Sequence, residues 1–230
     1  MALFKLKDMQ EERVEPEFCE ARGKFVRGKE IEVGQIFYPV GTEMKAHALP
    51  NEQIFTVMEG KAAVRVGGEE KTVFPGEVVL IRPETEFSIR VVERLEVLRF
   101  QDVGAGPAAK KEGGQAFFKW AEMKSDFITP MYSTGWGPVV SGERIEVAYM
   151  FYPAAGGGKP HSHPNEQIQV TLKGQSRSRI GGDEQVRGPG DVVFMPPNTE
   201  HSGQTLEDMT VVNCKNIVPG WSVYHARWEK

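Results

Sequence analysis

Pro50-Asn51-Glu52-Gln53-Ile54 occurs a second time in this chain, 114 residues later, as Pro164-Asn165-Glu166-Gln167-Ile168. The same offset aligns residues 26–86 with residues 140–200 without a gap, and 27 of these 61 positions are identical. A match of this length indicates a duplicated domain rather than a short solenoid repeat. The sequence therefore predicts two domains of one fold, at residues 1–103 and 117–230, joined by a linker of small and charged residues at 104–116.

Within each domain, short apolar runs alternate with Gly, Pro and Glu-Glu turns, which is typical of an all-β barrel or sandwich. No segment between the runs is long enough for the helix of a βαβ crossover, so a parallel sheet is not expected. Residues 117–124 are compatible with a helix, and we expect them to open the second domain as a helical turn and arm.

Composition excludes several classes of partner. The net charge is −4 and the pI is about 5.8, without a basic stripe that would bind nucleic acid. No apolar stretch reaches the length of a signal-peptide core or a membrane span, so we expect a cytoplasmic protein without a membrane partner. Cys19 and Cys214 lie in different halves, and Cys214 is expected to be a buried thiol in an extended apolar run.

A cluster of metal-binding residue types lies in the second domain. His161, His163 and Gln167 share one parity, so in an extended chain their side chains point to the same face. His201 follows a Pro-Pro turn and is the expected fourth ligand, from a neighbouring strand. Three of the five histidines in the chain would then converge, and burying so many imidazoles without a metal would require many hydrogen-bond partners.

This arrangement resembles the two motifs of the cupin family, in which His-x-His and a following carboxylate or amide bind a divalent metal together with a distant histidine. The resemblance covers most of both domains and implies a bicupin, with two tandem cupin barrels of the double-stranded β-helix or jelly-roll type. Many cupins have glutamate as the third ligand. Here Gln167 has the ligand parity and Glu166 faces away from it, although a β-bulge could exchange the two.

The first domain lacks two of the ligands, because Leu49 and Phe87 stand where the second domain has His163 and His201. His47 and Gln53 alone are too few for a stable site. We expect the first barrel to be structural, with an apolar ligand pocket as the alternative.

The second barrel is expected to keep a polar cavity, in which Gln169, Thr171 and Arg177 contact the substrate. Arg179 lies on the same strand as Arg177, and a structural role is at least as plausible for it. Tyr149, Trp136 and Trp221 are candidates for the cavity mouth, and no catalytic residue can be named from the sequence.

Three imidazoles and an amide suit one divalent transition metal, which could be Fe, Zn, Ni, Mn, Co or Cu. The expected substrate is a small oxygenated anionic metabolite. The ligand pattern is similar to that of the bicupin isomerase of the bacilysin pathway and of cupins that ketonise unsaturated uronates, which implies isomerase or tautomerase chemistry through a metal-stabilised enediolate. An Fe(II) dioxygenase and a non-catalytic binding protein are the alternatives. A homodimer is also expected, with residues 1–24 and the tail at 221–228 exchanged between subunits.

Overall fold

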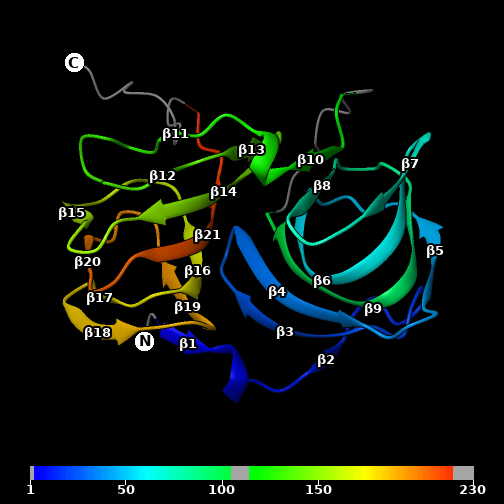
Figure 1. Ribbon diagram of the computed structural model, residues 1–230, viewed down its shortest axis with the longest axis horizontal. Coiled ribbons are helices and arrows are strands. Elements are labelled where there is room, and N and C mark those ends of the chain that lie inside the picture. The colour runs from blue at the N-terminus through cyan, green and yellow to red at the C-terminus, as the bar shows by residue number, and fades with distance from the viewer. Residues whose placement is uncertain (1–2, 105–113, 220–230) are drawn as a thin grey trace.

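The computed structural model describes residues 3–104 and 114–219, which form two β-barrels side by side (Figure 1). Most of the predicted linker, the tail at 221–228 and Trp221 lie outside the described residues. The only helices in the described part of the chain are two 3₁₀ turns, η1 (Leu6–Asp8) and η2 (Trp120–Glu122). None of its helices is long and apolar enough to cross a membrane.

The first barrel is built around one antiparallel sheet. Its strands follow apolar runs that end at turns, two of which place Gly67 and Gly76 at φ +57° and +86°, a region that favours glycine. The sheet order is β10-β8-β6-β9-β4-β3-β2, with β5 on β9 and β7 on β6. These strands are β2 (Glu12–Arg13), β3 (Arg22–Arg27), β4 (Ile31–Tyr38), β5 (Glu43–His47), β6 (Gln53–Val66), β7 (Glu69–Val73), β8 (Glu77–Ile81), β9 (Phe87–Asp102) and β10 (Phe117–Lys119).

The second barrel repeats this plan 114 residues later. One sheet has the order β1-β19-β16-β21-β14-β12-β11, with β13 on β14, and the other has the order β15-β20-β17-β18. The counterparts of β6 and β9 are each divided into two strands, and these four strands carry much of the candidate site. The strands are β1 (Leu3–Lys5), β11 (Asp126–Phe127), β12 (Trp136–Gly137), β13 (Val139–Ser141), β14 (Ile145–Tyr152), β15 (Gly157–His161), β16 (Gln167–Lys173), β17 (Ser176–Ile180), β18 (Asp183–Arg187), β19 (Asp191–Met195), β20 (His201–Thr205) and β21 (Met209–Asn216).

The two barrels exchange their first strands. β1 begins the chain yet pairs with β19 of the second barrel, and β10 follows the linker yet pairs with β8 of the first (Figure 1). The N-terminal arm is therefore exchanged between the two halves of one chain, and exchange between subunits remains a prediction. The boundaries at 103 and 117 also remain a prediction, and both exchanged strands cross them.

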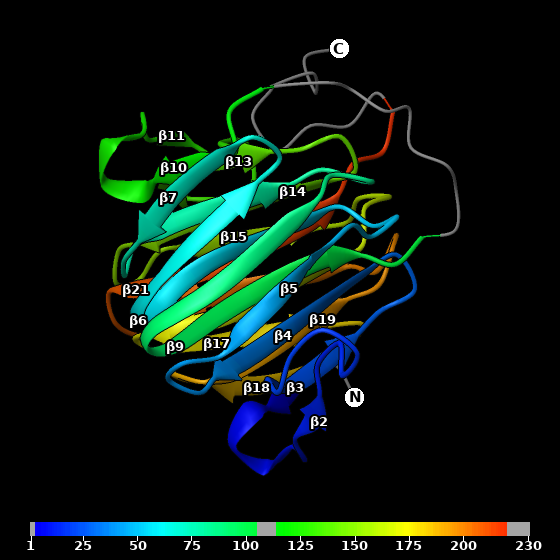
Figure 2. The same ribbon diagram turned by 90° about the vertical axis from the view of Figure 1, so that its right-hand side faces the viewer.

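An apolar layer joins the barrels. Figure 2 looks onto the first barrel, with strands of the second barrel behind it. Buried residues of β4, β6, β8 and β9 pack there against those of β14, β16, β19 and β21. Ile31, Ile54, Ile145 and Ile168, at matching positions of the repeat, are each fully buried in this layer. Cys214 also lies in it, and burial raises the pKa of its thiol well above the usual value. The predicted buried thiol is confirmed.

Candidate metal site

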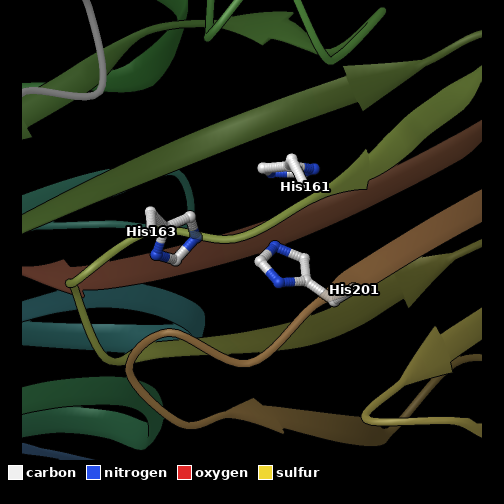
Figure 3. Close-up of side chains that lie close together, drawn as sticks. All are labelled: His161, His163 and His201. Atoms are coloured by element: carbon white, nitrogen blue, oxygen red, sulfur yellow. The ribbon is translucent and has the colours of Figure 1, made fainter.

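Three histidines converge inside the second barrel (Figure 3). His161 ends β15, His163 lies in the loop that follows it, and His201 begins β20. Antiparallel pairing sets His161 opposite His201. The ligand atoms of the three side chains all lie within 4.8 Å of one another. Because an ion bound at about 2.0–2.1 Å holds its ligand nitrogens at most roughly 4 Å apart, small ring rotations would let all three share one ion.

Hydrogen bonds to backbone carbonyl groups orient each ring. Nδ1 of His161, His163 and His201 contacts the carbonyl oxygens of Lys159, Asn165 and Thr199 at 2.7, 3.0 and 2.9 Å. A carbonyl only accepts, so each Nδ1 carries the proton and each Nε2 of the neutral ring keeps a lone pair. Histidines that bind a metal through one ring nitrogen typically donate a hydrogen bond from the other nitrogen, as these three do from Nδ1.

The surroundings keep the rings uncharged. Burial lowers the pKa of His163 to about 3 and that of His201 to about 4, and it also lowers the pKa of His161. The positive charge of Lys215 acts in the same direction on all three pKa values. The lone pairs are therefore available near neutral pH, where a metal would not have to displace protons from them.

Gln167, the predicted fourth ligand, places its side-chain oxygen at the same point. Its Oε1 lies 2.9 Å from Nε2 of His163, while its amide Nε2 donates to Oδ1 of Asn213 at 2.6 Å. In a neutral His163 with its proton on Nδ1, two acceptors face each other across this contact. A bound cation between them would satisfy both. The residues present therefore fit a divalent transition ion held by three imidazoles and one amide oxygen.

Glu166 points away from the histidines and into the other barrel. Its carboxylate accepts hydrogen bonds from the backbone N–H groups of Lys29, Glu30 and Ile31 at 3.0, 3.0 and 2.9 Å. Gln167 and not Glu166 faces the cluster, as the parity predicted.

Glu52, the counterpart of Glu166, reciprocates by accepting from the backbone of Glu143, Arg144 and Ile145. A Cβ at Gly28 or Gly142 would lie 2.0 or 2.1 Å from these carboxylates, which explains why both copies of the repeat have glycine there. The two glutamates therefore clamp the barrels together.

The matching position in the first barrel is filled by side chains. His47 stacks on Phe18 with ring centroids 3.8 Å apart and contacts the ring of Phe87. Its Nε2 lies 3.4 Å from a carboxylate oxygen of Glu15, which also pairs with Arg99. A buried core of this barrel occupies the interior in which the alternative apolar pocket would have lain.

A small cavity of about 70 Å³, lined by both polar and apolar side chains, adjoins His161 and His201. Gln169 lines it, and so do Asn213, Arg187 and Lys215, three residues that we did not predict. Thr171, which was also predicted to contact the substrate, does not line the cavity; it is fully buried, with no hydrogen-bond partner for its hydroxyl among the described residues. None of the described residues that line the cavity is an aspartate or a glutamate. The cavity is therefore neutral to cationic throughout.

Burial lowers the pKa of Lys215 to about 8 and that of Arg187 to about 10. A signal for both residues exists in the sequence. Lys215 lies two residues after Asn213, so both side chains point to the same face of the strand, opposite to Cys214. Arg187 stands where the first repeat has Val73, so a charged residue replaces an apolar one.

Arg177, which was predicted to contact the substrate, does not line the cavity. Alternation along β17 buries Ser176 and Ser178, so Arg177 and Arg179 project outward. The side chain of Arg177 is half exposed and lies 3.6 Å from Glu184.

Tyr149 and Trp136 do not lie at the mouth of the histidine cavity either. They line a separate cavity of about 500 Å³, with Trp120 and Met58. Trp120 comes from the exchanged arm and Met58 from the first barrel, so this cavity lies between the barrels and not inside the second one.

Comparison with known proteins gives matches in both halves. Residues 34–100 match the family model of the cupin domain, and residues 152–213 match that of the AraC-like ligand-binding domain. A search of curated protein sequences finds no significant match.

The structure is similar to that of AerE from Microcystis aeruginosa, with a TM-score of 0.74 and 13% identity over 91% of this chain and 97% of that one. It is also similar to oxalate decarboxylase from Bacillus subtilis, studied for its Mn(II) centres, with a TM-score of 0.71 and 14% identity over 93% of this chain and 76% of that one. At these identities the likeness concerns the fold alone.

Proposed function

Because the chain is a bicupin by fold, with two tandem cupin barrels as the sequence predicted, we propose that its second barrel is a metal-dependent isomerase or tautomerase of a small oxygenated carboxylate. One observation carries the proposal. The cavity beside His161, His163 and His201 has buried cationic side chains, and no carboxylate lines it among the described residues. Such a cavity favours an anionic ligand, whose charge would offset that of the ion and of Lys215.

A divalent ion held by His161, His163, His201 and Gln167 would supply Lewis acidity, withdrawing electron density from a ligand oxygen. All four protein ligands are neutral, so they leave the double charge of the ion uncompensated. The donor set leaves Fe, Zn, Ni, Mn, Co and Cu as candidates. Mn gains some support from the Mn(II) centres of the structurally similar oxalate decarboxylase.

The chain's own residues would orient and stabilise the ligand. Lys215 lines the cavity next to Asn213 on β21, and its ammonium stabilises negative charge that develops on a ligand oxygen. Gln169 follows Gln167 on the same face of β16 and offers both a donor and an acceptor for orienting the ligand. Burial of these groups keeps water from competing for the same contacts.

The test is elemental analysis of the purified protein, followed by assays of a panel of 2-oxo acids, enols and uronates with and without oxygen. The proposal predicts bound transition metal and conversion of a panel member at the same rate under nitrogen. Stoichiometric consumption of O₂ would instead identify a dioxygenase.

A second candidate is a ligand-binding protein without turnover, which the match to the AraC-like ligand-binding domain favours. Saturable binding of a panel member with no product in the metal-loaded protein would support it over both enzymes.

A further inference from the structure

Arg187 is a buried cation whose hydrogen-bonding capacity is not fully used. It ends β18, and its side chain lines the cavity of the second barrel with only 8% of its surface exposed. Its Nε donates to the hydroxyl of Ser176 at 2.7 Å. Its Nη1 is buried and has no hydrogen-bond partner among the described residues. Leaving a donor of a buried charged group without a partner costs free energy, and a ligand that accepts a hydrogen bond from this nitrogen would remove that cost.

The repeat shows that the fold does not require this arginine. Val73 takes its place in the first barrel and lies in the apolar core with Ala62 and Val64. These two residues correspond to Ser176 and Ser178, which are buried and line the cavity in the second barrel. The first barrel thus folds with an apolar version of the same wall, and the polar version is a local addition.

The wall lies some distance from the histidines. Along β20, His201 pairs with Ile180, whereas Thr205, four residues further on, pairs with Ser176, which in turn pairs with Arg187. Four residues of extended strand span roughly 13 Å. The backbone of Arg187 therefore lies well away from the histidines, although both line the same cavity.

We propose that Arg187 binds a carboxylate of the ligand, so that the ligand is a dicarboxylate with one acidic group beside the histidines and the other at this wall. The planar guanidinium fits a carboxylate better than it fits an isolated oxygen. The free space of about 70 Å³ is small, which favours a ligand with a short chain. This inference rests on the proposed function, because it extends the same cavity.

Calorimetric titration with matched acids tests the proposal. Malonate, succinate and glutarate are each compared with the monocarboxylate of the same chain length: propionate, butyrate and pentanoate. The wild-type protein should bind at least one dicarboxylate about ten-fold or more tightly than its partner, as expected for a charged hydrogen bond.

Arg187→Met should remove this preference, so that each dicarboxylate binds about as tightly as its monocarboxylate partner. Arg187→Lys should retain part of it, because the charge remains but the planar fork is lost. Arg177→Met is the matched control. It removes an arginine from the outer face of the adjacent strand and should behave as the wild type does. Circular dichroism of each variant confirms that it is folded.

A preference that persists in Arg187→Met, a wild type without any preference, or no saturable binding of any dicarboxylate would overturn the inference. Metal analysis of the same samples separates the two proposals. A wild type that binds no metal contradicts the proposed function, whereas a metal-loaded wild type that binds both kinds of acid equally contradicts only the role of Arg187.

Discussion

Replacing Glu166 by glutamine tests whether this side chain points into the first barrel or toward the histidines, and so whether the fourth metal ligand is the amide of Gln167 or the carboxylate of Glu166. In the structure the carboxylate accepts hydrogen bonds from the backbone N–H groups of Lys29, Glu30 and Ile31 in the first barrel. A glutamine of the same shape turns its NH₂ toward one of these donors and weakens the bonds from the other two. The change therefore weakens the clamp between the barrels without touching the histidine cluster.

The size of the effect follows from these contacts. Hydrogen bonds to charged groups contribute about 1.5–3 kcal/mol each and neutral ones about 0.5–1.5 kcal/mol, so one lost and two weakened bonds amount to about 3–5 kcal/mol. The lower desolvation cost of an amide returns part of this, leaving a loss of about 2–3 kcal/mol in unfolding free energy. For a chain of this size, such a loss lowers Tm by roughly 4–12 °C.

Differential scanning calorimetry and elemental analysis of the same samples give the readout. Glu52→Gln is the matched control, because Glu52 makes the reciprocal contacts with the second barrel. Both variants should lose similar stability and keep the metal content of the wild type. If Glu166→Gln lost its metal and Glu52→Gln did not, Glu166 would be a metal ligand and the assignment of Gln167 would be refuted.

Three further predictions follow from burial. The unfolded chain protonates its histidines near pH 6.5, whereas in the folded protein His163 and His201 stay neutral down to about pH 3 and 4. The metal-free protein should therefore lose stability as the pH falls from about 6.5 toward 4, by at most about 1.4 kcal/mol per pH unit for each ring. Urea unfolding in the presence of a chelator measures this loss, and equal stability at pH 7 and pH 5 would contradict the prediction. Leu6→Ala removes a buried side chain of the exchanged arm from the layer between the barrels and should cost about 2–5 kcal/mol in urea unfolding, whereas a cost below about 1 kcal/mol would show that the arm is not packed there. Gly142→Ala should destabilise the protein because its Cβ would lie 2.1 Å from Glu52, whereas Gly68→Ala, with open space around it, should not; equal Tm values for the two variants would contradict the clamp.

The internal repeat made the fold predictable. A match over residues 26–86 and 140–200 indicates two copies of one fold, and strand alternation places His161, His163 and Gln167 on one face without coordinates. The exchange of β1 and β10 could not be predicted in this way. Each strand has three residues, too few to show a pattern, and its partner lies far away in the sequence.

The site differs from the prediction because side chains alternate between the two faces of β17 and because some of its contacts join residues that are far apart in the sequence. The replacement of Ala62 and Val64 by Ser176 and Ser178 marks the inward parity of β17, and this parity places Arg177 outside. Arg187 was not predicted, although it stands where the first repeat has Val73, and the register of β17 and β18 brings it to the inner wall. The partner of Glu166 was beyond local reasoning as well, since its contacts lie about 136 residues away in the other barrel.

One metal site, in the second barrel only, is the central claim, and metal stoichiometry tests it most directly. After loading and removal of excess ion, elemental analysis should find about one transition ion per chain in the wild type and in His47→Ala, and almost none in His161→Ala or His201→Ala. Two ions per chain, an ion lost in His47→Ala, or an ion retained in His201→Ala would contradict the account.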